Sequence, residues 1–170
     1  MENNPSFLPV VGIDIGRVLM SATDPDGTAD TSFLSGSDLD ALETPPTPGA
    51  LAALGTLVDR CDGRVWLVSK CGARVADLTR RWLVHQGVYT RTGLRPEQVR
   101  FCRERRGKAP ICLEVGVTHF VDDRADVHRH LAGIVPFRFL FGYQSGPAPA
   151  ELVHVRDWGE ALRALIATGV

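Results

Sequence analysis

Short apolar runs alternate with stretches of helical spacing along the 170 residues of this chain. The apolar runs are rich in β-branched and aromatic residues, which is typical of strands that are buried on both faces of a parallel sheet. They occupy 8–13 (LPVVGI), 64–69 (RVWLVS), 119–123 (HFVDD), 137–141 (FRFLF) and 152–155 (LVHV).

Between these runs, apolar residues recur every three or four positions, as on one face of a helix. The spacing predicts helices over 48–60, 72–86 and 109–115, a short helix at 127–131, and a last helix capped by Asp157. We expect Thr47 to cap the first helix and Pro48 to open it. The alternation predicts an α/β fold: one doubly wound, Rossmann-like parallel sheet over residues 1–170, with helices on both faces.

Composition and the N-terminus indicate a cytoplasmic protein. Apolar residues make up 44% of the chain and charged residues 23%, which is ordinary for a soluble domain. No apolar run approaches the roughly 20 residues of a membrane span, and MENNPSFLP lacks the features of a signal peptide. The four cysteines form no C-x-x-C pair, so free thiols are expected rather than disulfides or a zinc site.

Charge is unevenly distributed, although the formal net charge is only −1. Residues 1–62 are acidic, whereas 91–108 carries seven basic residues and only two acidic ones. Two interpretations stay open for this basic segment: a solvated helix face, or a surface that attracts a polyanionic substrate. Nucleic acid is not favoured as a partner, because one basic segment alone is weak support for it.

The ends of the predicted strands carry the candidate chemistry. In open parallel sheets, ligands bind beyond the carboxyl ends of the strands. The first strand ends at Asp14, the second at Ser69, and the third at Asp122 and Asp123. Lys108 opens the helix that precedes the third strand, so we expect these side chains to meet at one edge. The five histidines form no predicted ligand set, and His128 and His130 are expected at the surface.

These residues stand in segments that resemble, in order, the four motifs of the haloacid dehalogenase superfamily. The segments are GIDIG (12–16), LVSK (67–70), GK (107–108) and FVDDR (120–124). The resemblance is to phosphatase-like members with a D-x-G form of the first motif and little or no cap, and it runs from about Val10 to about Gly142. It implies a phosphohydrolase that acts on a phosphomonoester.

A second aspartate also matches the nucleophile signature of that superfamily, because residues 24–28 read D-P-D-G-T. A nucleophile has to sit where a buried strand meets a loop, and only Asp14 follows such a strand. D-P-D-G is also strong turn chemistry. We therefore assign the nucleophile to Asp14 and interpret Asp24 as part of a hairpin tip. The family carries a hairpin flap after its first motif, and 17–44 would form that flap or a small insert.

The resemblance also assigns roles to the other residues. The catalytic set would be Asp14, Ser69 and Lys108, and the substrate-binding set Ser69, Lys70 and Lys108. Mg²⁺ would be held directly by the carboxylates of Asp14 and Asp122 and by the backbone carbonyl of Gly16. Asp123 would act indirectly or through water, with an exchange of roles between Asp122 and Asp123 as the alternative. For Ser69, capping of the next turn is the structural alternative.

One position departs from the family pattern. Phosphatases of the family carry a second aspartate two residues after the nucleophile, as general acid and base, and here that residue is Gly16. The resemblance then implies slow or substrate-restricted turnover. The alternative is a catalytically silent module that binds a phosphorylated ligand or a protein partner. The short spacing between the motifs leaves no room for a large cap, so the open site suits a bulky substrate or a homo-oligomer that covers it.

Overall fold

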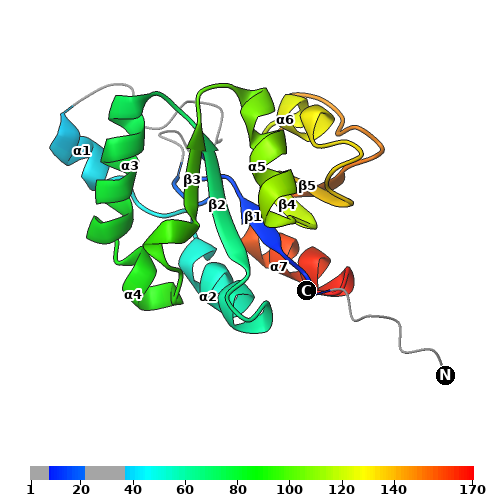
Figure 1. Ribbon diagram of the computed structural model, residues 1–170, viewed down its shortest axis with the longest axis horizontal. Coiled ribbons are helices and arrows are strands. Elements are labelled where there is room, and N and C mark those ends of the chain that lie inside the picture. Colours follow the sequence, from blue (N-terminus) through cyan, green and yellow to red (C-terminus); the bar gives the residue numbers. More distant parts are fainter. Residues whose placement is uncertain (1–7, 22–36) are drawn as a thin grey trace.

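A computed structural model describes residues 8–21 and 37–170 of the chain. Six parallel strands form one sheet in the order β3-β2-β1-β4-β5-β6 (Figure 1). The strands are β1 (Val11–Ile13), β2 (Val65–Lys70), β3 (Val99–Cys102), β4 (His119–Asp122), β5 (Phe137–Phe141) and β6 (Val153–Val155). The helices are α1 (Asp38–Leu42), α2 (Ala50–Arg60), α3 (Ala73–His85), α4 (Val88–Thr92), α5 (Lys108–Val115), α6 (Ala125–His130) and α7 (Trp158–Ala167), with 3₁₀ turns at Pro96–Gln98 and Arg105–Gly107.

Both faces of the sheet are covered, as the apolar runs predict. Alternate residues of each strand point to opposite faces. Val11, Ile13 and Leu67 face a larger core with α2, α3, α4 and α7. Val68 and Phe120 face a smaller core with α5 and α6. The predicted doubly wound sheet with helices on both faces is therefore confirmed.

The strand order places a switch point between β1 and β4. The chain runs outward from β1 to β2 and β3, then crosses to β4 and runs outward the other way. A crevice opens where two such connections diverge, beyond the carboxyl ends of the strands. The backbone N–H of Asp14 donates to the carbonyl of Val121 across this point, at 2.9 Å. The ends of β1 and β4 are thus held side by side.

The basic segment 91–108 is not a helix face. It contains the end of α4, both 3₁₀ turns and β3, which the hydrophobic pattern did not predict. β3 lies at the edge of the sheet and is only partly buried, so it needs no long apolar run. Arg100 stacks over the ring of Trp66 at 5.3 Å and pairs with Glu114 at 3.3 Å.

The start of α2 also differs from the prediction. The helix begins at Ala50, and Gly49 is its N-cap in the left-handed region at φ 79°. Thr47 caps nothing, since its buried hydroxyl oxygen has no hydrogen-bond partner among the described residues. The backbone can turn into the helix at Gly49 because glycine tolerates positive φ. The predicted cap of the last helix is confirmed: Asp157 accepts from the N–H of Glu160 at 2.8 Å.

Segment 17–44 is described only at its two ends. Asp24 and the rest of the expected hairpin tip lie outside the described residues. The returning end forms α1, which is fixed on α3: the indole N–H of Trp82 donates to the carbonyl of Thr44 at 2.8 Å. Asp38 pairs with both Arg74 and Arg81, at 3.1 Å each.

The state of the cysteines and the lengths of the helices can be compared with the expectations from composition. All four cysteines are free thiols. Within the described ranges, no helix combines the length and the apolar character that a membrane crossing requires.

Gly12 permits a close approach between β1 and the ring of Phe120 on β4. A Cβ atom at position 12 would lie 2.4 Å from Cδ2 of Phe120 and 3.2 Å from a methyl group of Val117. The Phe120 ring is fully buried and faces the edge of the His128 ring, so it has little room to move away. Residue 12 therefore has to be glycine for reasons of space.

We expect Gly12→Ala to lower the free energy of unfolding by about 1–3 kcal/mol, because the added methyl overpacks the core. Urea titration at neutral pH would measure the change. Gly146→Ala is the matched control, since a Cβ there meets no atom within 4 Å, and it should stay within about 0.5 kcal/mol of wild type. Equal stability of the two variants would contradict the packing argument.

Candidate active site

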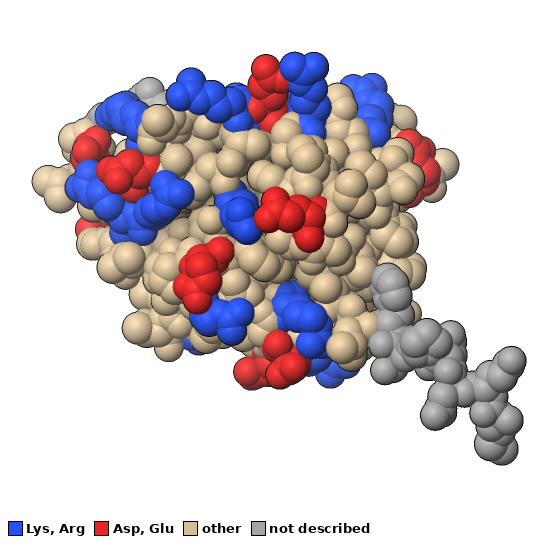
Figure 2. Space-filling view, in the orientation of Figure 1, with Lys and Arg blue, Asp and Glu red and all other residues tan. Residues whose placement is uncertain are grey.

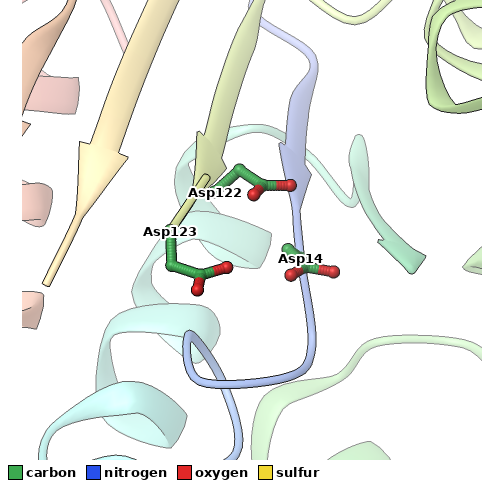
Figure 3. A group of neighbouring side chains, drawn as sticks. All are labelled: Asp14, Asp122 and Asp123. Carbon is green, nitrogen blue, oxygen red and sulfur yellow. The ribbon is translucent and has the colours of Figure 1, made fainter. Parts of the chain in front are cut away.

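Three carboxylates converge at the switch point of the sheet (Figure 3). Asp14 follows β1 directly, Asp122 ends β4, and Asp123 is the next residue. One oxygen atom from each lies within 4.8 Å of the others. The parallel strands bring them together because neighbouring strands end at the same edge of the sheet.

Lys108 lies among these carboxylates. It is the first residue of α5 and its side chain is only 2% exposed. Its Nζ atom is 2.8 Å from Oδ1 of Asp14 and 2.6 Å from Oδ2 of Asp122. Burial works against the ammonium form, but the two carboxylates outweigh it and raise the pKa of Lys108 above its ordinary value. The two carboxylates therefore favour the charged form of Lys108.

Asp122 and Asp123 have different surroundings. Asp122 is fully buried: Oδ2 accepts from Lys108, and Oδ1 accepts from the backbone N–H of Arg124 at 3.0 Å. Asp123 is an ion-pair partner of Arg17. For both aspartates, burial, reinforced by the neighbouring Asp14 charge, raises the pKa above the usual range of a carboxyl group.

A cavity of about 240 Å³ opens onto the cluster. Six of the seven residues that the sequence singled out line it: Asp14, Gly16, Ser69, Lys70, Lys108 and Asp123. The seventh, Asp122, is absent from the lining and contacts Lys108 instead. The structure thus places the predicted residues together at one edge of the sheet.

Ser69 does not cap the helix that follows it. It lies within β2, and the N-cap of α3 is Gly72. Its hydroxyl group makes no hydrogen bond to any part of the chain that the structure describes, and the residue lines the cavity. The capping alternative is therefore wrong.

Three arginines at the site were not singled out from the sequence. Arg17 has a left-handed backbone at φ 61°, unusual for a side-chain-bearing residue, and reaches Asp123. Arg105 and Arg124 line the cavity, and both pair with Asp126, at 3.1 and 3.2 Å. The charge excess of 91–108 hinted at Arg105. Arg17 and Arg124 stand next to motif residues, but nothing in the sequence shows where they point.

His128 was expected at the surface and is fully buried instead. It lies on the face of α6 that packs on the sheet, and its Nε2 is 3.2 Å from the backbone carbonyl of Asp122. His128 and His130 are two positions apart and so lie on different sides of α6. The side that carries His128 faces the core, and the side that carries His130 is exposed. Burial lowers the pKa of His128 to about 4.

A comparison with solved structures agrees with this architecture. A crystal structure of a haloacid dehalogenase-like family hydrolase from Xanthomonas campestris matches with a TM-score of 0.61, over 94% of this chain and 95% of that one. The chain has the haloacid dehalogenase-like fold. At 15% identity, the match concerns the fold alone. Neither the family models nor the curated proteins that were searched contain a match.

The buried His128 predicts sensitivity to acid in this haloacid dehalogenase-like domain. Its pKa is about 4 in the folded state and near 6.5 when unfolded. The unfolded state therefore binds the proton first as pH falls. Above about pH 6.5, His128 is neutral in both states and does not lower the free energy of unfolding. Between about pH 6.5 and pH 4, its protonation in the unfolded state lowers the free energy of unfolding by about 3 kcal/mol in total.

Urea unfolding of wild type and His128→Gln between pH 7 and pH 4 would test this. As the pH is lowered, the free energy of unfolding of wild type should decrease relative to that of the variant. Both proteins have the same carboxylates, so the effect of carboxylate titration cancels in the difference. His130→Gln is the control, since His130 lies exposed on the same helix. Parallel curves for wild type and His128→Gln would rule out this source of acid sensitivity.

Proposed function

We propose that the protein is a magnesium-dependent phosphohydrolase that cleaves a phosphomonoester through an aspartyl-phosphate on Asp14. The observation that carries the proposal is the convergence of three carboxylates around a buried lysine at the wall of an open cavity. A structural ion pair would need only one carboxylate for one lysine. Surplus carboxylates that are directed towards a cavity suit a cation and a phosphoryl group.

Asp14 is the residue best placed to attack phosphorus. Its backbone is tied to β4 by the bond to Val121, and Oδ1 accepts from Lys108. The carboxylate is thereby held in one orientation at the cavity wall, which is the condition for in-line attack. Bond formation between a carboxylate oxygen and phosphorus would release the alcohol, and water would then hydrolyse the acyl phosphate.

The donor set fits Mg²⁺, a hard cation that prefers oxygen ligands. We infer that Asp14 and Asp123 are the direct carboxylate ligands and that the carbonyl of Gly16 is a third, because all three residues line the cavity. Asp122 would act indirectly, since Lys108 and the N–H of Arg124 already occupy its oxygens. When bound, the ion would offset the charge that builds up on the transferred oxygens.

Lys108 and Ser69 would bind the phosphoryl group from the chain itself. The ammonium of Lys108 stays charged and lines the cavity, so it can stabilise negative charge on a phosphoryl oxygen. The hydroxyl of Ser69 is free to donate a hydrogen bond, since it makes none within the described protein. Lys70 extends the positive charge at the mouth of the cavity.

We expect Asp14→Asn to reduce phosphate release by at least about 10³-fold with the fold intact, because the amide is not a nucleophile. p-Nitrophenyl phosphate with Mg²⁺ is the assay, and EDTA should abolish the wild-type rate. Circular dichroism would check folding. A variant that keeps the wild-type rate would remove Asp14 from this role. Tight phosphate binding by a wild type without turnover would favour the silent module instead.

Asp24→Asn is the matched control for the choice between the two candidate aspartates. It should leave the rate within a few-fold of wild type, because no apolar run of the kind that predicts a buried strand precedes Asp24 in the sequence. A collapse of activity in a folded Asp24→Asn protein would show that the nucleophile had been assigned to the wrong residue.

Gly16 stands at the position where the resemblance expects a general acid and base, and restoring a carboxyl group there is a separate test. Gly16 lines the cavity, its φ is not positive, and a Cβ there meets no atom within 4 Å. The left-handed backbone lies one residue later, at Arg17. The backbone and the Cβ atom of an aspartate are therefore accommodated at position 16.

Gly16→Asp should raise the rate on alkyl phosphates about tenfold or more, because their leaving oxygen needs a proton. It should help little with p-nitrophenyl phosphate, whose leaving group departs without one. Rates on both substrates and the melting temperature would be measured, with Gly16→Asn as the control that cannot donate a carboxyl proton. A stable variant with no gain on alkyl phosphates would show that another group already supplies the proton.

A further inference from the structure

The wall of the cavity carries more basic than acidic side chains. Five basic residues line it, namely Arg17, Lys70, Arg105, Lys108 and Arg124, against two carboxylates, Asp14 and Asp123. Lys108 is held by the carboxylate cluster and Arg17 by Asp123. The other three stand outside the cluster, and we call Lys70, Arg105 and Arg124 the cationic rim.

The rim has little compensating charge of its own. Arg105 and Arg124 share a single carboxylate, Asp126, and each side chain is 41% exposed. Lys70 is exposed at the end of β2, and no ion pair joins it to another described residue. One carboxylate therefore faces three cations. Figure 2 shows Lys and Arg gathered along the upper edge of this face, above the ends of β2 and β3.

The charges around the cavity exceed what a cation and a phosphomonoester would balance. The five basic residues meet four carboxylates: Asp14, Asp122, Asp123 and Asp126. A bound divalent cation would add two positive charges, and a phosphomonoester brings roughly two negative ones at neutral pH. The carboxylate cluster with Lys108, Arg17, the cation and the phosphoryl group then carries about one negative charge, whereas the rim with Asp126 carries two positive charges that nothing at the phosphoryl site uses.

Space for a leaving group adjoins the rim. A second hollow shares Arg17, Asp123 and Arg124 with the first cavity and continues to Asp126 and Tyr143. Tyr143 is 60% exposed there and offers an apolar ring surface. The two hollows adjoin at Arg17, Asp123 and Arg124, so a leaving group that extends past Arg124 would meet the second hollow.

We propose that the cationic rim binds a second anionic group, a carboxylate or a phosphate, on the leaving group of the phosphomonoester. This rests on the proposed phosphohydrolase function. Lys70 and the two arginines would supply charge-assisted hydrogen bonds to that group. Substrates whose leaving group is neutral would lack these bonds and react less well.

Three aryl substrates test the proposal: phenyl phosphate, 3-carboxyphenyl phosphate and 1,3-phenylene bisphosphate. We expect kcat/KM to be at least about tenfold higher for one of the two anionic compounds, the size of one charge-assisted hydrogen bond. Whichever of the two anionic compounds has the higher kcat/KM identifies the second anionic group as a carboxylate or a phosphate. In Lys70→Met and Arg124→Gln, the ratio of the preferred compound to phenyl phosphate should fall towards one.

Arg103→Gln is the matched control. Arg103 is an exposed arginine close to Arg105 in sequence, and it is not part of the cavity wall. Its removal changes the net charge by the same amount but should leave the ratio unaltered. If Arg103→Gln lowers the ratio as much as Arg124→Gln does, the preference comes from the general field of the protein, and the rim is not a site.

Measuring the binding of these compounds tests the rim independently of hydrolysis. Calorimetry with the Asp14→Asn protein would give dissociation constants for the same three compounds without turnover. An anion preference in binding that Lys70→Met removes would support the rim even if wild type hydrolyses nothing. Hydrolysis of phenyl phosphate at the same efficiency as both anionic compounds, with equal binding of all three, would overturn the rim and leave the phosphohydrolase intact.

Discussion

The site depends on the ammonium group of Lys108, which lies buried between Asp14 and Asp122. Three carboxylates whose oxygens lie within 4.8 Å repel one another, and burial adds a desolvation penalty for each. A single fixed cation between two of them offsets much of that repulsion before any metal arrives. Removing it would leave a buried charge without a partner, which typically costs several kcal/mol. The carboxylate cluster and the first residue of α5 are therefore one structural unit.

The packing of the sheet places that unit. Phe120 lies against Gly12 on one strand and within 5.5 Å of the Lys108 ammonium on α5. The same ring thus contacts both β1 and the lysine. Asp14 and Asp122 continue the two strands, which pair in parallel with Gly12 opposite Phe120, so the carboxylates stand beside this contact. A core substitution at this point would reach the site through geometry, without any change of charge.

Sequence patterns predicted most of this arrangement because they depend on local physics. Buried parallel strands require continuous apolar runs. The observed strands end at Ile13, Lys70 and Asp122, within one residue of the predicted ends at Asp14, Ser69 and Asp122–Asp123. β3 was missed because an edge strand with Arg100 resting on Trp66 needs no such run. His128 was misplaced for a related reason. A histidine in a short helix gives no sign of which side meets the sheet, and that depends on how α6 crosses β4.

The sequence favoured Asp122 over Asp123 as the direct metal ligand, but two adjacent carboxylates look alike in a sequence, and in the structure only Asp123 lines the cavity. In the structure, successive residues of β4 point to opposite faces, so Asp122 follows Phe120 towards α5 and meets Lys108. Asp123 comes after the strand has ended and is free to turn to the cavity, where it meets Arg17. Strand periodicity therefore decides which carboxylate supports the lysine. Arg17, which pairs with Asp123, has a left-handed backbone directly after Gly16. The turn at Gly16 and Arg17 thus places a cation beside the carboxylate that lines the cavity.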